Sequence, residues 1–402
     1  AAMGARAPLA YGVCAVAMGL VVICFAEAGS RVSLTGGPDA YVRVALGPFA
    51  GFLSCVLIWA VALFAISAVA SAMVASAAVL CPVLARPAIR AVTLAVVIGS
   101  VAAVNVRGVR GGARLVELLT VAKLAPLILF VVAGALVAPS VVGAQPRPSG
   151  DLGRTVVILV FAFAGVESAL VPSGEVKDPA RTVPRAVGLA MLTVTALYIA
   201  IQLVAQRLLG VPALAANTAA PLAAAAQRIA GPAGAALIAG CAVVSMFGNV
   251  SGMTLATPRA LYAMGRDGFL PFVSHLVARI HPRYRTPYVA IVAQSVLVYA
   301  LAVSSQFAAL AVLANVAVLT LYLLCCAATI MLRHRDVRAG GIPFRVPAGA
   351  WVPFAAIAVI VWILSHATRR ELLVVGCVVA ASSVFYAVTA PRRRLAARVA
   401  TP

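Results

Sequence analysis

The sequence predicts an all-α polytopic membrane protein, and three observations lead to this fold class. Hydrophobic residues make up 64% of the 402 residues and charged residues only 10%, whereas a soluble domain has about 45–50% and about 25% of these classes. Apolar runs of about 20 residues, the length with which a helix crosses a bilayer, recur along the chain. This length argues against a β-barrel, whose strands alternate over about ten residues. We therefore expect one transmembrane domain over residues 1–402 and not an enzyme.

Eleven apolar runs are long enough to form spanning helices. Proline, glycine and arginine occupy the gaps between them, and proline and glycine there are typical of connections between helices. The predicted spans are residues 9–29, 48–80, 87–106, 117–138, 152–173, 184–208, 225–255, 286–303, 307–332, 349–366 and 371–390.

The net charge of +21 is distributed in short clusters between the apolar runs. Such clusters are typical of topology signals, and they form no basic helix face, so we expect no nucleic-acid partner. The loops after the odd-numbered spans, together with the C-terminal tail, hold 21 Lys and Arg residues, and the opposite side holds nine. The positive-inside rule then predicts a multi-pass protein of the cytoplasmic membrane, with a cytoplasmic C-terminus and with Ala1 outside. Because no signal peptide precedes this external start, we expect one further spanning helix before Ala1.

Charged residues inside a span are costly and are candidates for function by default. Glu27 ends the first span and is expected to reach the cytoplasmic interface. Glu167 lies well inside the fifth span, where small residues and Gly165 interrupt a helix-favouring run. A helix break at mid-membrane is tolerated where it lines a cavity, and such breaks mark substrate sites in secondary transporters. The alternative is a continuous helix in which Glu167 only bonds to a neighbouring helix.

Lys123 lies six residues inside the fourth span, which is about 9 Å deep at about 1.5 Å per residue. Its long side chain either snorkels to the interface or carries a coupling proton as a buried, easily deprotonated amine. The loop after the fifth span combines Glu175, Lys177 and Arg181 with two prolines. This loop is either a solvated connector or a gate whose ion pairs form in one conformation. The eight cysteines show no ligand spacing, so we expect no metal and no cofactor.

Several segments together resemble one transporter family. The stretch Phe161–Arg185 resembles the sixth helix and the following loop of the amino acid–polyamine–organocation (APC) transporters, and its Gly-Val-Glu-Ser core is similar to the basic amino acid/polyamine antiporters. Four other segments follow in the order found in that family, and the resemblance extends over essentially the whole chain. They are residues 27–52, 105–109, 258–271 and 281–287.

The resemblance implies an inverted five-helix repeat transporter fold followed by two more helices. Residues 9–138 would form an incomplete first repeat, residues 152–332 the second repeat, and residues 349–390 the final pair. The start of the chain is similar to the family's second helix. The resemblance therefore implies that 11 transmembrane helices are present of an expected 12.

The resemblance also implies where the substrate binds. An amino acid would lie at mid-membrane between the broken first and sixth helices, with Phe161 as an aromatic gate and Glu167 and Lys123 in proton coupling. Ion pairs of Glu175, Lys177 and Arg181 would contribute to gating. Ile66 and Met253 depart from the arginine/agmatine exchangers and favour a neutral or apolar amino acid. The substrate-binding residues would be Phe161, Ala162, Phe163, Ala164, Gly165, Val166, Glu167 and Ser168.

The leading hypothesis is a secondary active transporter that moves amino acids by alternating access, driven by a proton or by an exchanged amino acid or amine. Its partners would be these solutes and the lipid bilayer, and a homodimer is left open. Two alternatives remain: a truncated relic that inserts without transporting, and a substrate-binding sensor on the same scaffold. A membrane enzyme is not expected, because no span holds two convergent acid/base groups.

Overall fold

The computed structural model describes residues 3–32, 38–108, 112–137, 151–165, 179–217, 220–266, 268–270, 273–338, 344, 349 and 351–399. Within these residues the chain is helical and contains no strand. The predicted all-α fold class is therefore confirmed.

Eleven apolar helices occur in the described residues, and they follow the eleven predicted spans in order. Seven are long and apolar enough to cross a membrane: α1 (Ala7–Arg31), α3 (Pro48–Leu80), α4 (Pro87–Arg107), α8 (Pro179–Ala216), α9 (Pro221–Ala256), α13 (Phe307–His334) and α15 (Arg369–Val399). Four are shorter in their apolar part: α5 (Gly112–Val137), α6 (Leu152–Phe163), α12 (Tyr288–Ser304) and α14 (Trp351–Ser365). Short helices connect them: α2 (Pro38–Leu46), α10 (Pro258–Arg266), α11 (Ser274–Val277), η1 (Gly4–Arg6) and η2 (Pro82–Ala85).

Proline and glycine set many of the helix boundaries, as the sequence predicted. Helices α3, α4 and α9 each begin with a proline, whose fixed φ suits the first helical turn and whose missing N–H would have no partner there. Helix α4 ends at Gly108, which adopts a φ of +81°. A residue with a side chain would be strained in that left-handed conformation.

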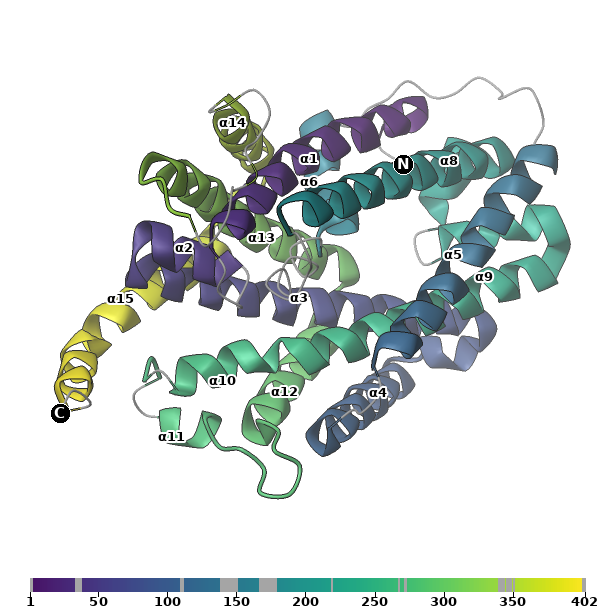
Figure 1. Ribbon diagram of the computed structural model, residues 1–402. Coiled ribbons are helices and arrows are strands. Elements are labelled where there is room, and N and C mark those ends of the chain that lie inside the picture. Colours follow the sequence, from purple (N-terminus) through teal and green to yellow (C-terminus); the bar gives the residue numbers. More distant parts are fainter. Residues whose placement is uncertain are drawn as a thin grey trace.

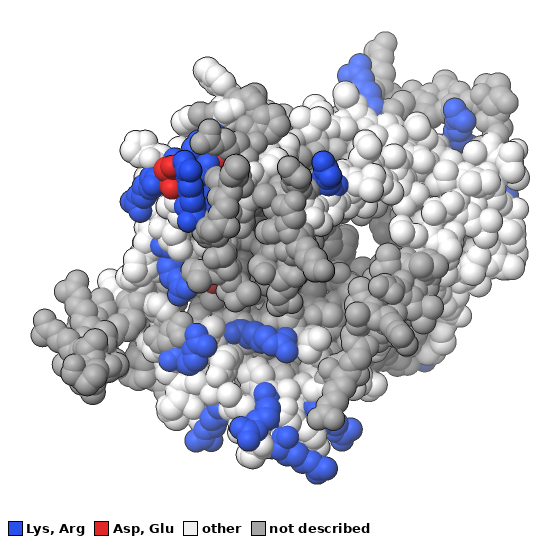
Figure 2. Space-filling view, viewed as in Figure 1, with Lys and Arg blue, Asp and Glu red and all other residues white. Residues whose placement is uncertain are grey.

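Helix α3 runs through the middle of the molecule and packs against α2, α9, α12 and α13 (Figure 1). Helix α1 lies alongside α8 and also contacts α6, α13 and α14. The main hydrophobic cluster joins α1, α6 and α13, and a second one joins α3, α4, α9 and α12. Figure 2 shows that uncharged residues form most of the described surface on this face, with charged side chains gathered in a few places.

Three long helices carry irregularities that hydropathy did not reveal. Helix α8 bends at Gly210, which has a φ of +74°. Helix α9 is interrupted at Ala230 and Gly231, just before Pro232. Helix α5 contains Pro126 in its interior, where the ring removes a backbone hydrogen bond. Such breaks free backbone groups inside the bundle, which is tolerated where protein or a cavity surrounds them.

Candidate functional site

The predicted interruption of the fifth span coincides with the end of α6. The helix stops at Phe163, Ala164 turns to an extended conformation with ψ of 152°, and Gly165 has a φ of +107°. The amide of Ala164 still donates to the carbonyl of Val160, at 2.8 Å. A helix end leaves its last carbonyl oxygens without intrahelical partners. Helix α6 therefore presents backbone acceptors part of the way along an apolar run, and the predicted span of 152–173 is helical only to Phe163 within the described residues.

Neighbouring helices hold α6 in place near this end. The hydroxyl of Tyr198 on α8 donates to the carbonyl oxygen of Ala162, at 3.0 Å. The Tyr198 ring lies edge-on to Phe163, with centroids 5.5 Å apart, and it also contacts Tyr11 of α1 at 6.0 Å. On the other side, the buried amide of Asn315 on α13 donates to the carbonyl of Val157, at 2.7 Å. Side chains of α1, α8 and α13 thus fix the last turns of α6.

The opposite end of α6 is anchored by charge. Asp151 caps the helix by accepting the amide of Gly153, at 3.0 Å. Arg154 forms a bidentate ion pair with Glu371 at the start of α15, with both N–O distances at 2.7 Å. Bidentate arginine–carboxylate pairs are strong and geometrically specific. Because both ends of α6 are held, its carboxyl end has a defined position.

Phe161 lies at the junction of three helices. Its ring is perpendicular to that of Phe307 at the start of α13, with centroids 5.7 Å apart. Phe161 and Phe64 of α3 both pack against a small buried cluster that includes Leu310. Phe161, the residue predicted as an aromatic gate, therefore lies between α3 and α13.

Several predicted site residues lie outside the described residues or are described only by their backbone. Val166, Glu167, Ser168, Glu175 and Lys177 belong to the first group. Lys123 on α5 and Arg181 on α8 belong to the second.

A mainly apolar cavity of about 310 Å³ lies between α3, α5 and α9. The few polar groups in its wall include the hydroxyls of Ser76 and Ser245, and Pro126 and Leu127 of α5 also line it. Binding pockets for small molecules are typically apolar with a small number of polar groups, and this volume is at the lower end of their range of about 300–1,000 Å³. Lys123, the predicted coupling lysine, lies three residues before Pro126 on the same helix.

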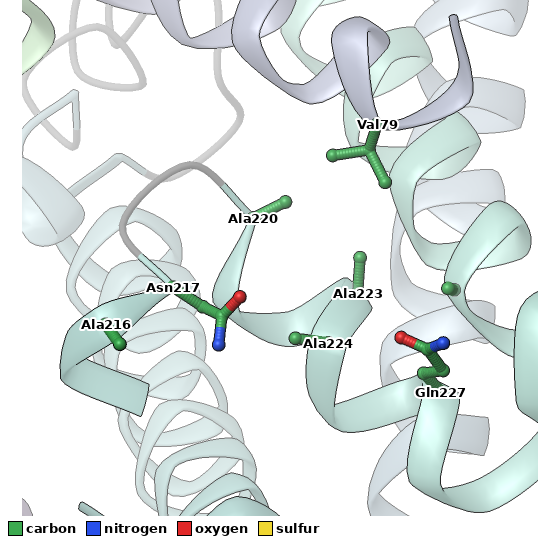
Figure 3. A pocket seen from close by; sticks show the side chains of 8 residues that line it. Val79, Ala216, Asn217, Ala220, Ala223, Ala224 and Gln227 are labelled. Carbon is green, nitrogen blue, oxygen red and sulfur yellow. The ribbon is translucent and has the colours of Figure 1, made fainter. Parts of the chain in front are cut away.

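A second cavity, of about 280 Å³, shares Ala220 and Ala223 with the first. Figure 3 shows it between the end of α8, the first turns of α9 and Val79 of α3, with the amides of Asn217 and Gln227 on either side of the alanines. Neither cavity is lined by Phe161–Gly165. The structure therefore brings the α5 segment near a cavity but does not join it to the end of α6.

Glu27, which the sequence places at the end of the first span, is buried within the protein. Its side chain is fully buried, and its carboxylate accepts hydrogen bonds from the Nε atoms of Arg31 on the same helix and of Arg333 on α13, both at 3.0 Å. Arg31 is also buried and donates to the carbonyl of Val337, at 3.3 Å. A buried charge is tolerated only when it is paired and hydrogen-bonded. Glu27, Arg31 and Arg333, here called the ion triad, join α1 to α13.

Sequence reasoning did not identify Tyr198 or Asn315. A tyrosine and an asparagine inside apolar spans indicate only weakly that a hydrogen bond to another helix exists, because buried polar side chains need a partner. Nothing in the sequence indicated that both partners would be backbone carbonyls of α6.

Replacing Tyr198 with phenylalanine is expected to lower the free energy of unfolding by about 1 kcal/mol, because it removes one hydrogen bond and retains the ring. Thermal unfolding of the purified protein measures this loss. Tyr299→Phe on α12 is the matched control, since the described residues include no hydrogen-bond acceptor for its hydroxyl. Equal effects of the two substitutions would contradict an anchoring role for Tyr198.

Comparison with known proteins gives one family match and several relatives. The amino acid permease family matches residues 1–389. The serine/threonine exchanger SteT of Bacillus subtilis is 27% identical over 358 residues, which cover 86% of this chain and 78% of the relative. The methylthioribose transporter of the same organism is 26% identical, with 87% and 78% covered. An uncharacterized transporter of Mycobacterium tuberculosis is 30% identical over 315 residues, with 76% and 68% covered.

Proposed function

Because the chain belongs to the amino acid permease family, within the APC transporters, we propose that it carries amino acids across the cytoplasmic membrane by alternating access. Its family and relatives are transporters and not enzymes, and the protein is a multi-pass membrane protein. The single observation that carries the proposal is the end of α6 at Phe163, inside an apolar run, with a fixed set of backbone acceptors.

The free carbonyl groups at a helix end can accept the ammonium group of an amino acid. A helix C-terminus also carries a partial negative charge, which favours a cation. We assign the substrate's amino group to the carbonyl oxygens of Phe161–Ala164, of which the Ala162 oxygen also accepts the Tyr198 hydroxyl. Gly165 allows close approach because it lacks a side chain. Phe161 is then placed to open and close one side of the site.

A small neutral amino acid is the proposed substrate. Ile66 lies in the apolar cluster with Met253 and carries no group that would bind a guanidinium or a polyamine. The name of one relative, a serine/threonine exchanger, agrees with this class. The methylthioribose transporter, at similar identity, makes a different solute the second candidate.

Proton coupling is assigned to Glu167 and Lys123, on the resemblance to the proton-linked antiporters. Glu167 follows the end of α6 by four residues, and Lys123 lies three residues before Pro126, which lines the cavity between α3, α5 and α9. The proposed gate is formed by Glu175, Lys177 and Arg181 with Phe161. We include three further points in the proposal. The chain is divided into an incomplete first repeat, a second repeat and a final pair of helices, at residues 9–138, 152–332 and 349–390. Its C-terminus is cytoplasmic, and it forms a homodimer.

Uptake by purified protein in proteoliposomes tests the proposed function. Vesicles loaded with unlabelled serine are expected to accumulate labelled serine or threonine, while empty vesicles accumulate little unless a proton gradient is applied. Binding without flux would identify a sensor, and neither binding nor flux would favour the relic. Flux of methylthioribose without amino acid flux would change the substrate class.

Glu167→Gln is expected to remove the dependence of uptake on external pH while the protein is still made and inserted. Lys123→Ala is expected to do the same if the ammonium carries a proton. The uptake rate of both variants and of the wild type is measured between pH 5 and pH 8. An unchanged pH profile of Glu167→Gln would exclude Glu167 from coupling, and wild-type kinetics of Lys123→Ala would support snorkelling.

A further inference from the structure

Five arginines gather on α10 and on the loop between α11 and α12. All five side chains are exposed: Arg259, Arg266, Arg279, Arg283 and Arg285. Residues 258–288 hold these five arginines and one acidic residue, Asp267, which lies outside the described residues. Figure 2 shows basic side chains gathered in the lower part of the view, where Figure 1 places these elements. This surface, here called the arginine face, therefore carries an excess of positive charge.

Hydrogen bonds fix the backbone of the loop between α11 and α12, which carries Arg279, Arg283 and Arg285. The Nδ1 atom of His281 accepts the backbone amides of Arg283 and Tyr284, both at 3.2 Å. The amide of Arg285 donates to the carbonyl of His281 at 2.9 Å, and Arg285 itself has a φ of +57°. A non-glycine residue in this region is uncommon and marks a conformation that its surroundings impose. The arginine side chains thus project from a fixed backbone.

Three large apolar side chains lie exposed among the arginines. Val273 is 43% exposed, Leu276 37% and Ile280 46%. Their neighbour Val277 is buried with residues of α10 and α3, so the segment packs on the protein by one side and presents the other. Exposed apolar groups next to cationic ones are typical of segments that lie at a membrane interface.

The arginine face lies where spanning helices end. Thr286 donates its hydroxyl to the carbonyl of Val106 at the end of α4, at 2.6 Å, and α12 begins two residues later. Helix α10 directly follows α9. The face is therefore held at one end of α4, α9 and α12, where lipid headgroups are expected for helices that cross a membrane.

We propose that the arginine face binds the headgroups of anionic phospholipids of the surrounding bilayer. Guanidinium groups bind phosphate in a bidentate geometry, and Val273, Leu276 and Ile280 would insert beside the acyl chains. A soluble anion or a nucleic acid would use the arginines but would not require these three apolar side chains at a bilayer boundary. The inference does not depend on the transported solute.

Titration of the purified full chain with phosphatidylglycerol in mixed micelles tests this proposal. The lipid is expected to raise the Tm, and the rise should shrink as salt increases, whereas phosphatidylcholine should produce little change. In the variant R279Q/R283Q/R285Q, at least about tenfold more phosphatidylglycerol should be needed for the same rise, since each arginine near an anionic surface contributes about 1 kcal/mol. Native mass spectrometry of retained lipid gives a second readout.

The matched control is R86Q/R207Q/R228Q, which removes three exposed arginines that are predicted on the opposite side: Arg86 before α4, Arg207 on α8 and Arg228 on α9. This variant should respond to phosphatidylglycerol as the wild type does.

The variant V273S/L276S/I280S, with its arginines intact, should also retain less lipid. Equal responses of the two arginine variants, or the same rise with phosphatidylcholine or with inorganic phosphate at equal ionic strength, would overturn the proposal. The proposal would also be overturned if the variant R279Q/R283Q/R285Q lost a bound nucleic acid or protein while its lipid binding stayed unchanged. If the triple variant does not fold, each single substitution should still give a partial loss, and no loss in any of them would also overturn it.

Discussion

Replacing Glu27 with glutamine is expected to lower the free energy of unfolding by about 3–5 kcal/mol, the range for removing one partner of a buried ion pair. Glu27 is 0% exposed and its carboxylate binds both Arg31 and Arg333. Glutamine keeps the shape but loses the charge. Arg31, which is 1% exposed, would then stay buried with mainly the Val337 carbonyl and a longer contact of 3.9 Å to Asp336.

Denaturant or thermal unfolding of the purified protein measures this effect. The control is Arg338→Gln, because the Arg338 side chain is 54% exposed and pairs with Asp336 near the surface. Exposed ion pairs contribute only about 0–1 kcal/mol. Equal losses for Glu27→Gln and Arg338→Gln would show that the ion triad is not the source of the stability.

A second variant separates charge from packing in the ion triad. Well-packed apolar residues can replace a buried ion pair or triad without loss. The variant E27M/R31M/R333M should therefore recover most of the stability that E27Q loses. If it is as unstable as E27Q, the loss comes from missing hydrogen bonds or volume. If it is stable but inactive in uptake, the triad serves the relative movement of α1 and α13.

Hydropathy and proline placement were sufficient to predict the helices of this protein. A helix in lipid must satisfy its own backbone hydrogen bonds, so an apolar run of spanning length has few alternatives. The interior breaks at Gly210 and Gly231 were not predicted. Glycine is common in spanning helices, and its presence alone does not distinguish a bend from a close helix contact.

The candidate site was predictable only where a local signal existed. Gly165 and the surrounding small residues indicated the end of α6, and α6 does end there. The groups that hold it, Tyr198 and Asn315, come from helices far away in the sequence. The pairing of Glu27 was not predicted for the same reason, since Arg333 is 306 residues away along the chain. Which side chains of two helices face each other depends on how each helix is rotated about its axis. In a helix that is apolar all round, the sequence pattern does not indicate this rotation.

Gly134→Leu is expected to lower the free energy of unfolding by about 3 kcal/mol, near the upper end for overpacking a core. Gly134 lies where α5 meets α8, and a Cβ atom added there would clash with Cγ1 of Val204. Val204 is buried and β-branched, so its side chain has little freedom to move away. Small residues allow membrane helices this close approach.

The matched control for Gly134→Leu is Gly99→Leu on α4, because an added Cβ at Gly99 meets no heavy atom within 4 Å. Both substitutions replace a helical glycine with the same good helix former, so their intrinsic helix propensities change equally. Only Gly134→Leu should lower the Tm. Adding Val204→Ala should restore part of the lost stability, since it removes the methyl group that the new side chain would meet.

Two results would show that α5 and α8 are not in the close contact described. One is that Gly134→Leu and Gly99→Leu unfold at the same temperature, and the other is that Val204→Ala lowers the Tm further in the double variant. A confirmed contact would mean that α5, which carries Lys123, cannot move without α8, which positions the end of α6 through Tyr198.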